Sequence, residues 1–249
     1  MNLYRVTRFE VSKLFRQRTA YAGLIIVFLV CCLYSVINWI TRPVGSYSGV
    51  MIITDNVNFQ NSMLILPFLA VLVAANSICV ELSSGTLRTL FTRPVKRENV
   101  IAGKFLAVFL YMCLVVYGIA LLSFLFAIRW GFPEDFVSFI PRLLLICLVY
   151  VLANMVVVAF TFVVASQSAS IALTALVSVG FYVVSMLVEF FKQVQPYMFL
   201  HNAQNLFQTL LGGPFELRTA YYSIGIILIY ILGLLLIAST LWEKRDIKA

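Results

Sequence analysis

Long runs of apolar residues alternate with short polar segments along the whole chain. A helix rises about 1.5 Å per residue, so crossing a hydrocarbon core of roughly 30 Å takes about twenty apolar residues. Backbone groups in lipid must form hydrogen bonds within their own segment, so runs of this length predict helices. Six runs meet the requirement: 20–40, 63–80, 105–128, 143–165, 171–188 and 221–242.

The composition places these helices in a membrane rather than in a soluble core. Of the 249 residues, 62% are hydrophobic and 11% are charged, whereas a soluble domain carries about 25% charged residues. No polar stretch is long enough to mark off a second domain. We therefore predict an all-α integral membrane protein in which residues 1–249 form one six-helix bundle in the lipid bilayer.

The positions of the positive charges predict the orientation of the bundle. Thirteen of the eighteen Lys and Arg residues lie in the N-terminal tail, the segment 81–104 and the C-terminal tail, and five lie in the loops on the other side. Cytoplasmic segments carry the excess of positive charge, so we expect both termini to be cytoplasmic in the cell membrane. Nucleic acid is not expected as a partner, because the basic residues do not alternate with stacking aromatic residues.

The segment 1–19 is predicted to form an interfacial helix, because its apolar and basic residues occupy different arcs of a helical wheel. Phe9 breaks this pattern. A charged flank that only orients the first span is the alternative. The apolar arc consists of Leu3, Tyr4, Val11, Leu14 and Phe15, and the basic arc consists of Arg5, Lys13 and Arg16.

The cores of the predicted spans contain no Asp, Glu, Lys, Arg or His. Coupled carriers and intramembrane enzymes depend on such groups, so we predict neither a catalytic residue nor a metal site. The single histidine, His201, lies in a loop, and a membrane enzyme that uses it is the least favoured function. The five cysteines lie in apolar runs without a CxxC pair and are expected to pack as small apolar side chains.

Asn76 and Asn154 are the first candidates for lining a translocation path among the polar residues within the spans. The alternative is that they join helices through hydrogen bonds, as Ser, Thr and Asn side chains commonly do in membranes. The sequence has no GxxxxGK[ST] phosphate loop. If the chain transports a substrate, the energy must therefore come from a partner that binds ATP.

The segment 81–104 is the predicted binding place for such a partner. Ser83 or Ser84 can cap a short helix, and Pro94 ends it because proline cannot continue the helical hydrogen bonds. The segment could dock into a groove on a cytoplasmic partner. From the spacing alone, it could equally well be an amphipathic loop that lies on anionic lipid headgroups. Its apolar face consists of Leu87, Leu90 and Phe91.

The ordered residues of this segment are Glu81, Gly85, Thr86, Leu87, Leu90, Thr92, Arg93, Pro94, Val95, Arg97, Gly103, Lys104 and Phe105. They resemble the segment E…GTL…L…TRPV…R…GK of permease subunits in ATP-binding-cassette (ABC) exporters of the second type. The resemblance extends over essentially the whole chain. It includes the basic interfacial helix, the six spans, both termini inside and a longer outer loop before the last span.

The resemblance implies how the permease is assembled. Residues 85–94 would form a coupling helix in a cleft of a separate ATP-binding subunit, and the turn Ser166, Gln167, Ser168 would make a second contact. Two copies of that subunit would bind ATP and magnesium, so this chain needs no cofactor. A second permease subunit, identical or related, would face this one. The residues implied in ATPase coupling are Glu81, Gly85, Thr86, Leu87, Leu90, Phe91, Arg93 and Pro94.

The resemblance also implies that the outer loop, 189–220, contains a re-entrant segment, 195–213, that closes the outer gate. The predicted function is that of a non-catalytic transmembrane permease subunit of an ABC exporter. Spans without buried charge favour a hydrophobic or amphipathic substrate. The alternative function is a membrane scaffold or sensor that recruits a cytoplasmic partner through its basic loop and transports nothing.

Overall fold

The computed structural model describes residues 3–41, 48–83, 97–132, 136–212 and 217–244, and every regular element in these ranges is a helix. The α-helices are α1 (Leu3–Leu14), α2 (Arg18–Thr41), α3 (Gly49–Ser62), α4 (Ile65–Ser83), α6 (Arg97–Ala127), α7 (Phe136–Gln167), α8 (Ile171–Val188), α9 (Phe199–Leu211) and α10 (Leu217–Lys244). Two short 3₁₀ helices, Ile128–Trp130 and Gln195–Tyr197, follow α6 and precede α9.

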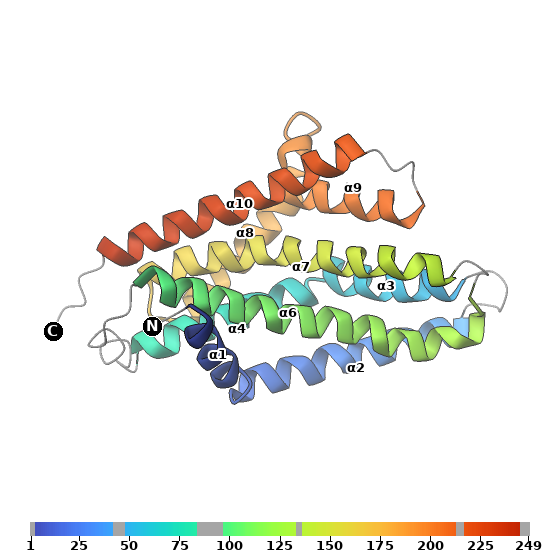
Figure 1. Cartoon of the computed structure of the whole chain (residues 1–249), viewed down its shortest axis with the longest axis horizontal. Helices are drawn as coiled ribbons and strands as arrows, with labels where there is room; N and C mark the ends of the chain where they lie inside the picture. Colours follow the sequence, from blue (N-terminus) through green and yellow to red (C-terminus); the bar gives the residue numbers. More distant parts are fainter. Residues whose placement is uncertain (1–2, 42–47, 84–96, 133–135, 213–216, 245–249) are drawn as a thin grey trace.

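Six of these helices (α2, α4, α6, α7, α8 and α10) are long and apolar enough to cross a membrane. The predicted all-helical fold with six spanning helices is therefore confirmed. Figure 1 shows these helices running along the long axis of the molecule, with α1 and the last turn of α10 at one end and α9 at the other. We call these the α1 end and the α9 end.

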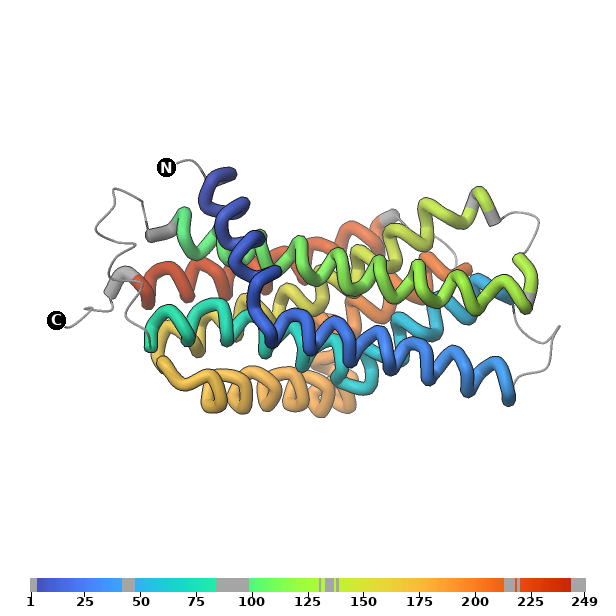
Figure 2. The backbone as a smooth tube through the Cα atoms, turned by 90° about the horizontal axis from the view of Figure 1, so that it is seen from below, coloured from blue at the N-terminus to red at the C-terminus, as the bar shows by residue number. Residues whose placement is uncertain are grey.

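The helices differ in how far the rest of the bundle covers them. In α4 and α7, 67% of the most apolar stretch is buried within the chain, whereas the values for α2, α8 and α10 are 22%, 28% and 17%. Figure 2 shows α2 and α8 on the outside of the bundle. Movement of α4 or α7 would therefore disturb most of the core, and movement of the outer helices would disturb little of it.

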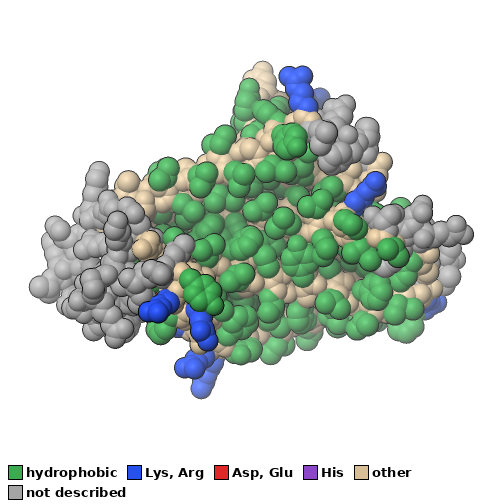
Figure 3. All heavy atoms as spheres, viewed as in Figure 1, with side chains coloured by type: hydrophobic (Ala, Val, Ile, Leu, Met, Phe, Trp, Pro, Cys, Tyr) green, Lys and Arg blue, Asp and Glu red, His purple; other side chains and the backbone are tan. Residues whose placement is uncertain are grey.

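The outer surface has the polarity that a bilayer requires. On the face in Figure 3, apolar side chains cover the middle of the helices, and Lys and Arg side chains lie toward the two ends. Exposed apolar residues on the outer helices include Ile25, Leu29, Leu176 and Leu232. Such a large apolar surface is stable only against lipid or another protein.

No helix is predicted from the sequence where α3 lies, in the loop between the first two spans. The segment is rich in polar residues, but Thr54, Asn56 and Gln60 are almost fully buried. Asn56 donates a hydrogen bond to Ser35 Oγ of α2 at 2.9 Å. α3 lies in line with α4 and continues it toward the α9 end (Figure 1). The two helices are separated by Met63 and Leu64. The φ of Leu64, 63°, is left-handed and costs about 1 kcal/mol in a residue with a Cβ.

The ends of the predicted segment 81–104 belong to helices, because α4 continues to Ser83 and α6 begins at Arg97. At the α9 end, α9 forms a helix within the predicted re-entrant segment 195–213. Several predicted coupling residues lie outside the described ranges, and their roles stay predictions: Gly85, Thr86, Leu87, Leu90, Phe91, Arg93 and Pro94.

Candidate functional site

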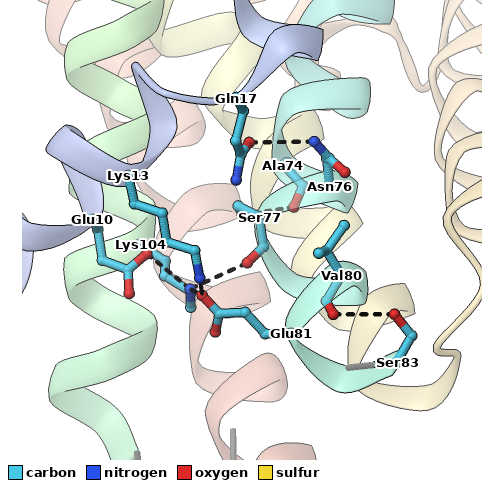
Figure 4. A network of polar contacts seen from close by, with 10 residues as sticks. All are labelled: Glu10, Lys13, Gln17, Ala74, Asn76, Ser77, Val80, Glu81, Ser83 and Lys104. Carbon is cyan, nitrogen blue, oxygen red and sulfur yellow. Dashed lines mark hydrogen bonds and ion pairs between the residues drawn. The ribbon is translucent and has the colours of Figure 1, made fainter. Parts of the chain in front are cut away.

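Four charged side chains meet where α1, α4 and α6 come together at the α1 end (Figure 4). Lys104 Nζ of α6 lies 2.8 Å from Glu10 Oε2 of α1 and 2.6 Å from Glu81 Oε1 of α4. It also donates to the backbone carbonyl of Ser77 at 3.1 Å. An ammonium group has three N–H donors, so Lys104 has an acceptor for each of them. Lys13 Nζ of α1 forms a further ion pair with Glu81 Oε1. We call Glu10, Lys13, Glu81 and Lys104 the ion-pair cluster.

Three members of the ion-pair cluster are almost inaccessible to solvent. The exposed fraction of the side chain is 3% for Lys104, 5% for Glu10 and 2% for Glu81, against 34% for Lys13. Two carboxylates and two ammonium groups balance each other in charge. A buried charge that loses its partner is strongly destabilising, by about 3–5 kcal/mol. The buried pairs of Lys104 with Glu10 and Glu81 therefore help to hold α1, α4 and α6 together.

The helix α1 approaches α6 closely because residue 103 is a glycine. A Cβ placed on Gly103 would lie 2.7 Å from Val6 Cγ1 and 3.3 Å from Val6 Cβ. Val6, Glu10 and Leu14 are spaced four residues apart, so they share one face of α1, and all three are buried. The contact between α1 and α6 thus combines close backbone packing at Gly103 with an ion pair at the next residue.

The buried face of α1 differs from the apolar arc predicted from the sequence. Tyr4 belongs to that arc, but its side chain is exposed, whereas the charged residue Glu10 is buried. Burial raises the pKa of the Glu10 carboxyl above its usual value, and the positive charge of Lys104 opposes this rise. The helical wheel assigned Glu10 to neither arc, and its burial depends on an ion pair that offsets the usual preference of a carboxylate for solvent.

The ion-pair cluster lies at the base of the loop that was predicted to couple to an ATPase. Glu81 is two residues before the end of α4, and Lys104 is in the second turn of α6. The Glu81–Lys104 pair therefore joins the two helices that flank residues 84–96, and Glu10 joins both of them to α1. Glu81 was predicted from the sequence as a coupling residue, and the structure gives it these two lysine partners.

The roles of Glu10 and Lys13 were missed, although the sequence carries one signal for them. The N-terminal segment 1–19 contains five Lys and Arg residues and one acidic residue, which is Glu10. A lone carboxylate in a basic interfacial helix is a candidate for an internal ion pair. Which lysine it would pair with could not be read from the sequence, since Lys104 is 94 residues away.

Asn76 lies nearer the middle of α4 and connects it to the corner between α1 and α2. Its Nδ2 donates to Thr19 Oγ1 at 2.6 Å and to Gln17 Oε1 at 3.3 Å, and Figure 4 shows the Gln17 contact. Asn154 of α7 donates to Asn61 Oδ1 of α3 at 3.0 Å and to the Tyr150 carbonyl at 2.8 Å. Both asparagines thus join helices, and their part in a translocation path stays a prediction.

The predicted second contact, the turn between α7 and α8, also lies at the α1 end. Ser166 Oγ donates to the Val163 carbonyl at 2.6 Å, Gln167 is exposed, and the Ser168 carbonyl accepts a hydrogen bond from Cys79 Sγ of α4 at 3.7 Å. Cys79 is two residues before Glu81. The turn and the ion-pair cluster are therefore connected through the last turns of α4.

Among the residues that the structure describes, no group of three or more His, Cys, Asp or Glu side chains is placed so that it could hold a metal ion. The buried charges of the ion-pair cluster are paired with each other. The ion-pair cluster therefore supports a structural role and not a catalytic one. It holds three helices in a fixed relation at the base of a polar loop.

The fold and the ion-pair cluster together define an integral membrane protein of six spanning helices whose buried ion pairs lie at one end of the bundle. A family model described as ABC-2 family transporter protein matches residues 7–185. This match covers well over half of the chain and contains Glu10, Glu81 and Lys104. The chain belongs to this family and is a type-2 ABC permease, a membrane component that works with an ATP-binding subunit. A search of the curated proteins found no match.

Proposed function

We propose that this chain is the permease subunit of an ABC exporter and that the ion-pair cluster couples the ATP-binding subunit to the spanning helices. The observation that carries the proposal is the position of Lys104, which joins the helices on both sides of the 84–96 loop and the interfacial helix α1. A force on residues 84–96 would then move α1, α4 and α6 as one body, because breaking the Glu10–Lys104 pair would leave the buried Glu10 carboxylate without its ammonium partner.

This body is connected to the centre of the bundle. α4 packs against α7 and α8, and α6 packs against α2 and α7. Closely packed helices transmit displacement because they cannot be compressed. Closure of the ATP-binding subunits on residues 85–94 would therefore tilt α4 and α6 and carry α7 with them, opening the bundle alternately to the two sides of the membrane.

The remaining parts of the proposal follow from the resemblance and the charge distribution. Two ATP-binding subunits bind ATP and magnesium, and two permease subunits face each other around one pathway. Both termini lie in the cytoplasm, which the excess of Lys and Arg in the terminal tails and the 81–104 segment supports. The substrate is hydrophobic or amphipathic, since the cores of the predicted spans contain no ionisable residue.

Replacing Leu90 with aspartate tests the coupling contact. We expect L90D to abolish co-purification of the ATP-binding subunit, because a carboxylate on the predicted apolar face would be buried without a partner in the cleft. Membrane insertion should be unchanged, since residue 90 lies outside the six spans. A pull-down in mild detergent measures the first outcome, and the amount of protein in the membrane fraction measures the second.

The matched control is T92D, which adds the same charge in the same segment but outside the predicted apolar face of Leu87, Leu90 and Phe91. We expect T92D to retain the ATP-binding subunit. Equal retention by L90D and the unaltered chain would contradict the proposal. If the complex forms but shows no ATP-driven substrate movement after reconstitution, the scaffold function predicted as the alternative is favoured.

A further inference from the structure

A cavity of about 200 Å³ lies beside the break between α3 and α4, away from the ion-pair cluster at the α1 end. Its walls come from α3, α7, α8 and α9. The polar residues that line it are Asn61, Ser62, Tyr150, Tyr182, Glu189 and Gln204. Asn61 and Ser62 directly precede the break between α3 and α4, so an occupant of the cavity would contact the chain at that break.

The hydroxyl groups that line this cavity donate their protons to residues of α3. Tyr150 Oη donates to Asn58 Oδ1 at 2.9 Å, and Ser62 Oγ donates to the same atom at 3.4 Å. Tyr182 Oη donates to the Asn61 carbonyl at 3.4 Å. A hydroxyl has one proton and two lone pairs. The three oxygens therefore remain available as hydrogen-bond acceptors.

Glu189 is the one charged residue among those that line the cavity. Its Oε1 atom is buried and has no hydrogen-bond partner in the part of the chain that the structure describes. Burial alone raises the pKa of this carboxyl, and no neighbouring positive charge lowers it. One oxygen of the half-buried Glu189 carboxylate is therefore removed from solvent without a counterion among the described residues. This is unfavourable for a negative charge, so the site is electrostatically complementary to a cation.

We propose that this cavity binds an organic ammonium group, with Glu189 as its counterion and the oxygens of Tyr150 and Tyr182 as acceptors of its N–H donors. A water molecule occupies about 30 Å³ of liquid, so the cavity holds several water volumes and is too wide to enclose a bare metal ion. It is smaller than the roughly 300–1,000 Å³ of pockets for whole drug-sized ligands. The occupant is therefore a headgroup, carried either by an amphipathic substrate or by a membrane lipid.

The test is binding of n-butylammonium to the full-length chain in dodecyl maltoside, a detergent without charge, measured by isothermal titration calorimetry. We expect saturable binding of n-butylammonium and none of 1-butanol, which has the same chain length without the charge. E189Q should weaken binding about tenfold, the loss expected for one charge-assisted hydrogen bond. Q204E, which adds a second carboxylate to the lining, should strengthen it.

The control variant is K192Q, because Lys192 is exposed, close in sequence to Glu189 and absent from the lining. It should bind within about twofold of the unaltered chain, as expected for a change of exposed charge. If E189Q does not fold, Y182F removes one acceptor, keeps the ring and should weaken binding by about threefold. Equal binding of n-butylammonium and 1-butanol, full affinity in a folded E189Q, or equal competition by sodium would overturn the proposal.

Addition of lipid separates the two sources of the ammonium group. If phosphatidylethanolamine, but not phosphatidylglycerol, competes with n-butylammonium, the site holds a lipid headgroup. If neither lipid competes, it holds the ammonium group of a substrate. The measurement uses no ATP-binding subunit, so its failure would leave the proposed coupling unaffected.

Discussion

Replacing Lys104 with methionine is expected to destabilise the protein by about 3–5 kcal/mol, the range for breaking a buried ion pair from one side. Methionine has a similar length but no charge, so Glu10 would lose the ammonium group of Lys104, its ion-pair partner among the described residues. Glu81 would keep Lys13. We expect a large fall in the melting temperature of the purified permease in detergent, measured by tryptophan fluorescence.

A second substitution shows whether the loss comes from charge. In the double variant K104M/E10Q, the orphaned carboxylate is gone, so we expect recovery of roughly half of the lost stability. K13M removes a lysine from the same cluster, but its side chain is 34% exposed, and we expect about 1 kcal/mol or less. If the effects of K104M and E10Q were simply additive, the two residues would not be coupled as the structure indicates.

Replacing Gly103 with alanine is expected to separate α1 from α6 and to reduce ATP-driven transport by at least about tenfold. The added Cβ would lie 2.7 Å from Val6 Cγ1, so α1 must move away, at a cost of about 1–3 kcal/mol. This movement would increase the distance between the Glu10 carboxylate and the ammonium group of Lys104, the residue next to Gly103. The ATP-binding subunit should still co-purify, since the predicted coupling residues are unchanged.

Two variants control for the glycine substitution. The double variant G103A/V6A removes the methyl group that collides, so we expect it to recover most of the transport. G180A adds the same methyl group to α8, where nothing lies within 4 Å of the new Cβ, and we expect transport to be unchanged. Loss of transport in G180A, or full transport in G103A, would show that the approach of α1 to α6 is not what couples the loop to the spans.

These two predictions make α1 a part of the moving unit rather than an anchor in the interface. The helix is held to α6 by close packing at Gly103 and to both flanks of the 84–96 loop by the ion-pair cluster. At the other end of α4, the helix meets α3 at the break beside the cavity that Glu189 lines. A displacement of α4 would therefore change the relation between the two polar regions of the protein.

The six spanning helices could be predicted from the sequence because the length and apolarity of a run are local properties. Gly103 and Lys104 lie in the motif that resembles type-2 ABC permeases, but the motif alone gave neither residue a role. The helix α3 could not be predicted from the sequence, because its many polar residues suggest a solvated loop. One of them, Asn56, is buried against a hydrogen-bond partner, Ser35, that lies on another helix.

By itself, the sequence determined the class of protein, the number of spans and the segment that carries the family motif. Each depends on residues that are close together in the chain. The tertiary structure alone decided that Glu10 pairs with Lys104, that Gly103 admits α1, and that Glu189 faces a cavity with the oxygens of Tyr150 and Tyr182. Whether a buried charge is stable depends on partners far away in the sequence, and only folding brings these together.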